Sequence, residues 1–161
     1  MKKTLAIVAT LLFSVYSQAS ETGRFSKVFA SSSTALIETL GQEASFSGSF
    51  YNDGSSDSGQ LVLVNELDAK GVSQLQGKIA VMEVSHRIPF LLTFQLLQSY
   101  GAIAVVMINV DDQLFEMQGE ALAATIPGLL ITHEAGAKIQ QAMSQGPVSI
   151  KVAPAHMTEG N

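Results

Sequence analysis

The chain has no cysteine and no tryptophan among its 161 residues. The absence of cysteine excludes disulfides, thiol nucleophiles, thiolate metal sites and lipid attachment at an N-terminal cysteine. The fold must therefore be held by its hydrophobic core alone, which a domain of about 140 residues can build.

Charged residues are also scarce. They make up 14% of the chain, and acidic residues outnumber basic ones by 14 to 9. An acidic chain without a basic stripe is poorly suited to nucleic acid or to an anionic membrane surface. We therefore expect neither as a partner.

The N-terminus is the exception in both charge and hydrophobicity. Two lysines precede an apolar run over Leu5–Phe13, and small residues follow at Ser17 and Ala19. This order is typical of a secretory signal peptide, and the run is shorter than the ~20 residues of a bilayer span. We predict a signal peptide over residues 1–19, cleaved between Ala19 and Ser20, with an uncleaved N-terminal anchor as the alternative.

Cleavage would leave a chain without stable membrane anchoring. It would carry seven basic and fourteen acidic residues, a net charge of −7. We expect an exported bacterial protein, located in the periplasm rather than outside the cell.

The clearest structural pattern lies in the middle of the chain. Ile79–Val84 and Ile103–Ile108 are apolar at nearly every position, which is typical of strands covered on both faces. Between them, Pro89 marks a helix start, and Phe90–Ser99 carries no breaker. Two buried strands joined by a helix pair in parallel, so we predict a central right-handed β-α-β crossover.

Elements on both sides complete the predicted fold. The patterns predict strands at 44–50, 60–64, 126–131 and 148–152 (the last at a sheet edge), and helical segments at 34–40, at 114–117 and after Thr132. We predict an α/β fold with a mixed, curled or barrel-like β-sheet and flanking helices. The predicted organisation is a signal peptide (1–19), an N-terminal segment with a Gly/Ser-rich loop (20–59), the α/β domain (60–152) and a flexible tail (153–161).

Motifs for catalysis or metal binding are missing from the sequence. There is no nucleophile elbow and no phosphate-binding loop. His133-Glu134 begins like a zinc motif, but Ala137 stands where the second histidine would be. Asp53 and Asp57 lie in a loop without the ordered ligands of a calcium site, so we interpret it as a solvated loop. We predict no cofactor and no enzymatic activity.

Three polar residues support alternative functions. His86 follows the first buried strand, and Asp111 and Asp112 follow the second; functional groups gather at such strand ends in α/β sheets. We interpret the two aspartates as a polar turn. The alternatives are a small secreted hydrolase that uses His86 or this pair, and a protein that binds a divalent ion or a small ligand.

The predicted helix Phe90–Ser99 is apolar around almost its whole circumference. A helix beside a sheet needs only one apolar stripe. Either the N-terminal segment buries its second side, or part of its surface awaits a partner. Leu91 and Phe115, together with Arg87 in the preceding loop, are the candidate interaction surface because recognition patches combine apolar and charged side chains.

The order of these elements resembles the protease-associated domain family. The matching text is Leu75–Val81, Phe90, Tyr100–Asn109, Ile126-Pro127, Leu130-Ile131, Gly136 and Val148–Val152. The chain departs from the family pattern before the helix, where Ser85–Phe90 keeps only the phenylalanine, and Thr93 replaces a common lysine.

The resemblance implies a non-catalytic module of the kind found in or beside peptidases and receptors. We expect a stand-alone exported module that binds protein or peptide, such as an exported peptidase or its substrate.

Overall fold

A computed structural model describes residues 24–50, 57–119 and 126–155. The predicted signal peptide with its Ala19–Ser20 cleavage site, Asp53 and the end of the predicted tail lie outside these residues. The described part contains seven strands and two helices: β1 (Phe25–Ser31), β2 (Leu36–Glu43), β3 (Ser58–Leu63), β4 (Ile79–Glu83), α2 (Phe90–Ser99), β5 (Ala104–Ile108), β6 (Gly128–Ile131), α3 (His133–Gln145) and β7 (Ser149–Pro154).

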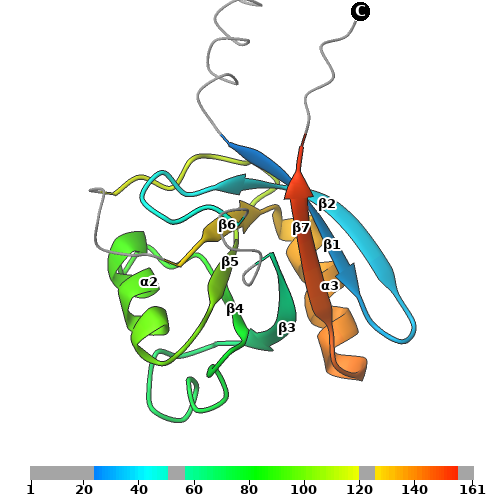
Figure 1. The fold of residues 1–161 in the computed structure, drawn as a ribbon, viewed down its shortest axis with the longest axis horizontal. Helices are drawn as coiled ribbons and strands as arrows, with labels where there is room; N and C mark the ends of the chain where they lie inside the picture. The colour runs from blue at the N-terminus through cyan, green and yellow to red at the C-terminus, as the bar shows by residue number, and fades with distance from the viewer. Residues whose placement is uncertain (1–23, 51–56, 120–125, 156–161) are drawn as a thin grey trace, which may run out of the picture.

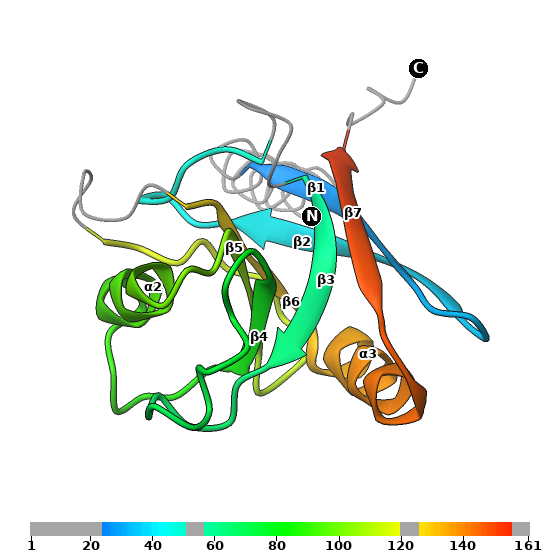
Figure 2. The same ribbon diagram turned by 60° about the horizontal axis from the view of Figure 1, so that its bottom comes forward.

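The seven strands form one closed barrel in the order β1-β2-β6-β5-β4-β3-β7. Strands β3, β4, β5 and β6 pair in parallel, whereas β1, β2 and β7 make antiparallel pairs. In Figures 1 and 2, α2 lies on the opposite side of the barrel from the tip of the β1–β2 hairpin. The predicted mixed, barrel-like sheet is therefore confirmed.

Strands β4 and β5 pair in parallel with α2 between them in the chain. The right-handed sense of this connection stays a prediction. Strands β4, β5 and β6 are buried at every position except Glu83. Their continuous apolar runs therefore reflect coverage on both faces.

Two apolar clusters cover these faces. One joins the parallel strands to β1, β7 and α3 through side chains such as Val28, Val106 and Ile139. The other packs the opposite face of the parallel strands against α2 through Phe94 and Leu97. Neither α2 nor α3 is long and apolar enough to cross a membrane, and these are the helices of the described residues.

Helix α2 ends where the sequence predicts. Tyr100 is the C-cap, and Gly101 has φ +91°, a left-handed conformation that favours glycine. The Gly101 N–H donates to the Gln98 carbonyl (3.0 Å) and the Ala102 N–H to that of Leu97 (3.1 Å). These two bonds form a Schellman motif, which satisfies the last carbonyls of the helix.

The predicted helix over residues 34–40 is wrong, because residues 36–40 lie in β2 and residues 34–35 in the turn before it. Leu36, Ile37 and Leu40 have a spacing that fits a helix, but β2 pairs with β1 over its length. Ser32 fixes the turn of this hairpin: its N–H donates to the Ala35 carbonyl (2.9 Å), and its Oγ accepts from the Ala35 N–H (3.1 Å).

Three further local predictions are corrected. Residues 44–50 form no strand beyond one bridge between Gly48 and Pro127, because Ala44 and Ser45 donate to the carbonyls of Gly128 and Met117 instead. Residues 114–117 are not helical. Strand β7 is not an edge strand, since it pairs with both β1 and β3, and it extends into the predicted tail as far as Pro154.

Candidate functional site

The carboxyl ends of the parallel strands gather the candidate residues at one edge of the barrel. Strand β3 leads into the loop 64–78, β4 into the loop 84–89, and β5 into the segment 109–119. Because parallel strands end at the same edge, side chains from these connections lie near one another.

A cavity of about 410 Å³ lies between the first two of these connections. Its lining residues are Asn65, Glu66, Leu67, Met82, Glu83, Val84, Ser85, Arg87 and Ile88. Apolar side chains from both loops and β4 combine here with two carboxylates and one guanidinium. We call it the Arg87 cavity.

Arg87 is exposed, and its backbone N–H donates to Ser85 Oγ at 3.2 Å, which folds the loop back on itself. Its guanidinium has no ion pair within the described residues. The sequence singled out this residue, and the structure places it in the wall of a cavity.

Leu91 and Phe115 occupy different surroundings. Leu91 is half-buried and packs against the apolar cluster beneath α2. Phe115 is 38% exposed, and its ring lies 5.9 Å from that of Phe90, between centroids. Phe115 therefore extends the apolar surface at the start of α2, but neither residue lines the Arg87 cavity.

The apolar circumference of α2 is covered on one side and exposed on the other. Phe46, from the segment after β2, packs edge-on against Phe94 with ring centroids 4.9 Å apart. On the outer side, Leu92 and Tyr100 remain more than 40% exposed. The N-terminal region thus buries one flank of α2 and leaves another open.

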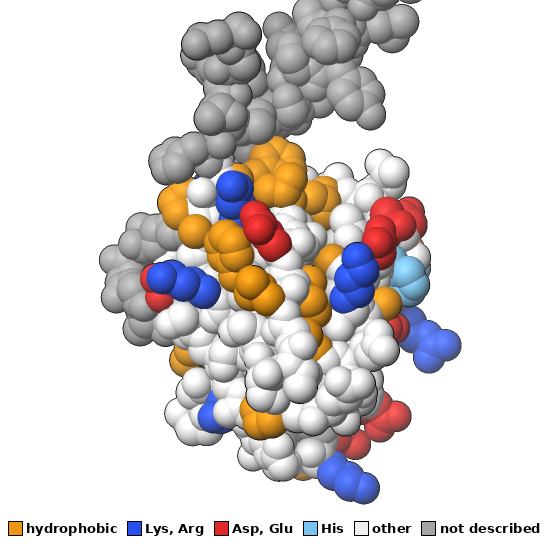
Figure 3. All heavy atoms as spheres, turned by 90° about the vertical axis from the view of Figure 1, so that its right-hand side faces the viewer, with side chains coloured by type: hydrophobic (Ala, Val, Ile, Leu, Met, Phe, Trp, Pro, Cys, Tyr) orange, Lys and Arg blue, Asp and Glu red, His pale blue; other side chains and the backbone are white. Residues whose placement is uncertain are grey.

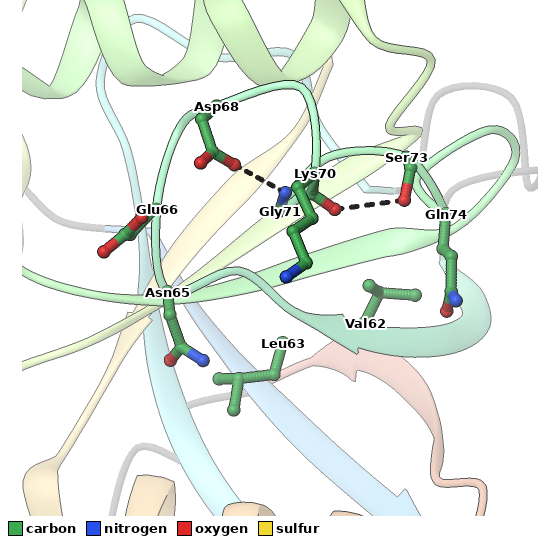
Figure 4. Close-up of a pocket in the computed structure, with 9 residues that line it drawn as sticks. All are labelled: Val62, Leu63, Asn65, Glu66, Asp68, Lys70, Gly71, Ser73 and Gln74. Carbon is green, nitrogen blue, oxygen red and sulfur yellow. Dashed lines mark hydrogen bonds between the residues drawn. The ribbon is translucent and has the colours of Figure 1, made fainter.

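A second cavity, of about 470 Å³, lies within the loop 64–78 itself (Figure 4). Asp68 Oδ1 accepts from the Gly71 N–H (2.7 Å), and Ser73 Oγ donates to the Lys70 carbonyl (3.0 Å). The Lys70 side chain points toward β3 (Figure 4). Asn65 and Glu66 line both cavities, so the two adjoin.

Neither cavity is predicted from the sequence. The position of the loop 64–78 was a usable signal, because loops that follow the carboxyl ends of parallel strands commonly carry binding groups. The loop residues themselves show no motif.

The three polar residues that supported the alternative functions do not form a site. Asp111 and Asp112 have structural roles, and His86 lies outside both cavities. Asp111 Oδ1 accepts from Asn109 Nδ2 and from the Gln113 N–H, both at 2.9 Å. Asp112 Oδ1 accepts from the Glu134 N–H at 2.8 Å, in the first turn of α3. The pair therefore builds a turn and caps a helix. His86 is exposed and lines neither cavity.

Within the described residues, no three His, Cys, Asp or Glu side chains gather closely enough to hold a metal ion. His133 is exposed on α3, and its backbone N–H donates to the Asp111 carbonyl at 2.9 Å. Asp57 accepts from the Val152 N–H through its backbone carbonyl at 2.7 Å.

A buried carboxylate lies where β2 meets β6. Glu43 is 2% exposed, and its Oε2 lies 3.5 Å from Arg24 Nε, while its Oε1 has no hydrogen-bond partner within the described residues. Burial raises the pKa of Glu43 above its ordinary value. The Arg24 guanidinium and a hydrogen bond from the Phe50 backbone act in the opposite direction.

Comparison with known proteins places this architecture among peptidase structures. An aminopeptidase from Aneurinibacillus sp. matches 81% of this chain with a TM-score of 0.59 and 21% identity. A zinc aminopeptidase from Bacillus subtilis matches 81% with a TM-score of 0.58 and 21% identity. An M28 peptidase precursor from Shewanella amazonensis matches 82% with a TM-score of 0.62 and 15% identity.

At sequence identities of 15% and 21%, the structural similarity shows only that this chain shares a fold with these proteins. The match spans 30% of the chain length in the first two proteins and 35% in the third. No curated protein matches the chain.

The sequence model of the PA domain matches residues 34–139, more than half of the chain. The match begins before β2 and ends within α3, so it takes in all four parallel strands and α2. The chain therefore belongs to the protease-associated (PA) domain family.

Proposed function

We propose that this PA domain is a non-catalytic, exported module that binds protein or peptide and is accessory to a peptidase. The observation that carries the proposal is the Arg87 cavity. Its apolar wall (Leu67, Met82, Val84 and Ile88) fits an apolar side chain of a partner, and the charges at Glu66, Glu83 and Arg87 fit polar groups beside it.

The closed barrel limits how a partner can bind. A peptide often binds by adding a strand to an open sheet edge. Here β4, the strand that borders the Arg87 cavity, already pairs with both β3 and β5, so it offers no such edge beside the cavity. We infer that side chains inserted into the Arg87 cavity, rather than main-chain pairing, supply the recognition.

Three observations support a role without catalysis. The aspartates Asp111 and Asp112 serve as hydrogen-bond acceptors for a turn and a helix start. His86 is exposed and lines neither cavity. The peptidases that share the fold are roughly three times as long as the matched region.

The binding test is a capture of exported proteins from the periplasmic fraction of the native host. Wild type is compared with Arg87→Ala and with Lys138→Ala, a matched change of an exposed cation on α3. We expect Arg87→Ala to lose a partner that Lys138→Ala retains, with equal melting temperatures. Equal retention by both variants would place the binding surface elsewhere.

Two direct measurements test the remaining parts of the proposal. Intact mass of the protein from its native host should correspond to a chain that begins at Ser20. A mass that includes residues 1–19 would contradict export with cleavage. Incubation of the purified protein with a peptide library should release no products, and turnover that is lost in His86→Ala or in Asp111→Asn with Asp112→Asn would establish the hydrolase alternative.

A further inference from the structure

The outer face of the β1–β2 hairpin is unusually apolar. An antiparallel sheet with one face on the core normally presents polar side chains on the other. On this face, Leu36 is 76% exposed and Leu40 is 48% exposed, and the half-buried Phe29 belongs to the same alternating set on β1. Figure 3 faces this side of the molecule, where hydrophobic side chains lie among Lys, Arg, Asp and Glu.

The register of the hairpin arranges four side chains of this face as a square. Lys27 lies opposite Leu40, and two residues further along, Phe29 lies opposite Glu38. All four residues are at alternate positions, so they point to the same side of the sheet. One diagonal of the square is apolar, Leu40 to Phe29, and the other joins opposite charges, Glu38 to Lys27.

The two charges have no partners in their own chain. Both residues are exposed, and neither Lys27 nor Glu38 forms an ion pair or a side-chain hydrogen bond with another described residue. Diagonal positions on a sheet lie about 7–8 Å apart, a distance that long side chains can span, but no ion pair joins Lys27 to Glu38 among the described residues.

This arrangement is complementary to itself. A two-fold axis that lies in the plane of the interface and runs along the apolar diagonal brings Leu40 onto Leu40 and Phe29 onto Phe29 of a second copy. The same rotation exchanges the ends of the charged diagonal. Lys27 of each copy then meets Glu38 of the other, so the interface gains two ion pairs and no like-charge contact within the square.

We propose that the outer face of the β1–β2 hairpin binds a second copy of this chain, with Leu40 and Phe29 at the centre and reciprocal Lys27–Glu38 pairs beside them. This surface is separate from the Arg87 cavity and does not depend on its function. Leu36, further along β2, extends the apolar contact toward the tip of the hairpin.

The self-association test uses charge reversal on the purified full chain, measured by sedimentation velocity over a range of concentrations. Lys27→Glu or Glu38→Lys turns both intermolecular pairs into repulsions. Each single change should weaken the dimer about tenfold or more, since two exposed pairs are inverted at once. The double variant Lys27→Glu, Glu38→Lys should restore wild-type association.

Mixing the two single variants gives the sharper result. A Lys27→Glu chain and a Glu38→Lys chain each repel their own kind, yet each pair between them is attractive. We expect a heterodimer in the mixture and monomers in the separate samples. An ion pair within one chain would give no such rescue by mixing.

Substitutions of two similarly exposed leucines, one inside and one outside the proposed interface, supply the control. Leu40→Lys should abolish association, whereas Leu92→Lys, on α2 at similar exposure (46%), should leave it unchanged. Melting curves confirm that all variants are folded. A wild-type chain that stays monomeric at every concentration, or a dimer that survives Leu40→Lys and both charge reversals, would overturn the proposal.

Discussion

Strands β4 to β6 and strands β1 and β7 belong to one barrel, but they are buried in different ways. The central parallel strands are buried at all but one position, because the second apolar cluster under α2 covers the face that points away from the barrel interior. In β1 and β7, buried and accessible residues alternate along the strand. The parallel side thus carries the core of the fold, and the antiparallel side presents one face outward.

This difference in burial determines where a partner molecule can contact the barrel. On the parallel side, surface becomes available only at strand ends, where the Arg87 cavity lies. On the antiparallel side, a whole sheet face is available, and the exposed Leu36 and Leu40 lie on it. Substitutions on the two sides should therefore differ most in their effect on stability.

The largest expected effect comes from Leu97→Asp. Leu97 is fully buried between α2 and the parallel strands, and an unpaired carboxylate there would have to be desolvated. We expect a loss of more than about 4 kcal/mol, which leaves no folded protein. The control is Leu40→Asp on the exposed antiparallel face, which should remain folded and keep a cooperative melting transition. A cooperative melting transition in Leu97→Asp would show that α2 is not packed as described.

A smaller effect is expected at the contact of β6 with α2. A methyl group on Gly128 would overlap the Phe94 ring, so Gly128→Ala should lower the free energy of unfolding by about 1–3 kcal/mol. Replacing the Phe94 ring with the smaller leucine side chain should relieve the overlap. In a double-mutant cycle measured by urea denaturation, Gly128→Ala with Phe94→Leu should cost less than the sum of the single changes. Additive costs would contradict the contact.

The same difference in burial explains which elements the sequence could predict. Runs such as Ile79–Val84 and Ile103–Ile108 are apolar because both faces are covered, and no other element of that length fits them. The end of α2 and the start of α3 were predicted, because Gly101 and Thr132 supply local termination and capping signals.

The hairpin could not be predicted in this way. Leu36 and Leu40 lie on its outer face, so the alternation expected of a half-buried strand is reversed, and their spacing imitates a helix. The pairing with β1 across the turn 32–35 defines β2, and the apolar pattern of β2 alone does not reveal it. The Arg87 cavity has the same origin, since the loop 64–78 and the loop 84–89 meet only in the fold.

Helix α3 packs against β2 and β5 and so connects the two sides of the barrel. Its N-cap, Thr132, accepts a hydrogen bond from the Ala135 N–H at 3.2 Å. Thr132→Ala should cost about 1 kcal/mol of unfolding free energy, and Thr132→Ser should restore most of it. Thermal melting of the three proteins measures this; a Thr132→Ala protein as stable as wild type would mean that Asp112, which accepts from Glu134, caps the helix alone.

The smallest effect is expected at Glu43, where the antiparallel strand β2 pairs with the parallel strand β6. Burial raises the pKa of this carboxyl, and Arg24 only partly offsets the effect. A carboxyl whose pKa is higher in the folded than in the unfolded protein binds protons more readily when folded. The charged form therefore destabilises the fold at neutral pH, and the penalty disappears as pH falls through the raised pKa to below the ordinary value.

Glu43→Gln removes the charge while it keeps an oxygen that can accept from Arg24. We expect the variant to be more stable than wild type at pH 7, by no more than about 1 kcal/mol, because the lost ion pair with the half-exposed Arg24 opposes the gain. The difference between the two proteins should shrink as pH falls, because wild-type Glu43 becomes neutral in both states. Urea denaturation at a series of pH values measures it. A difference that is constant with pH would mean that the carboxyl at this junction titrates alike in the folded and unfolded chain.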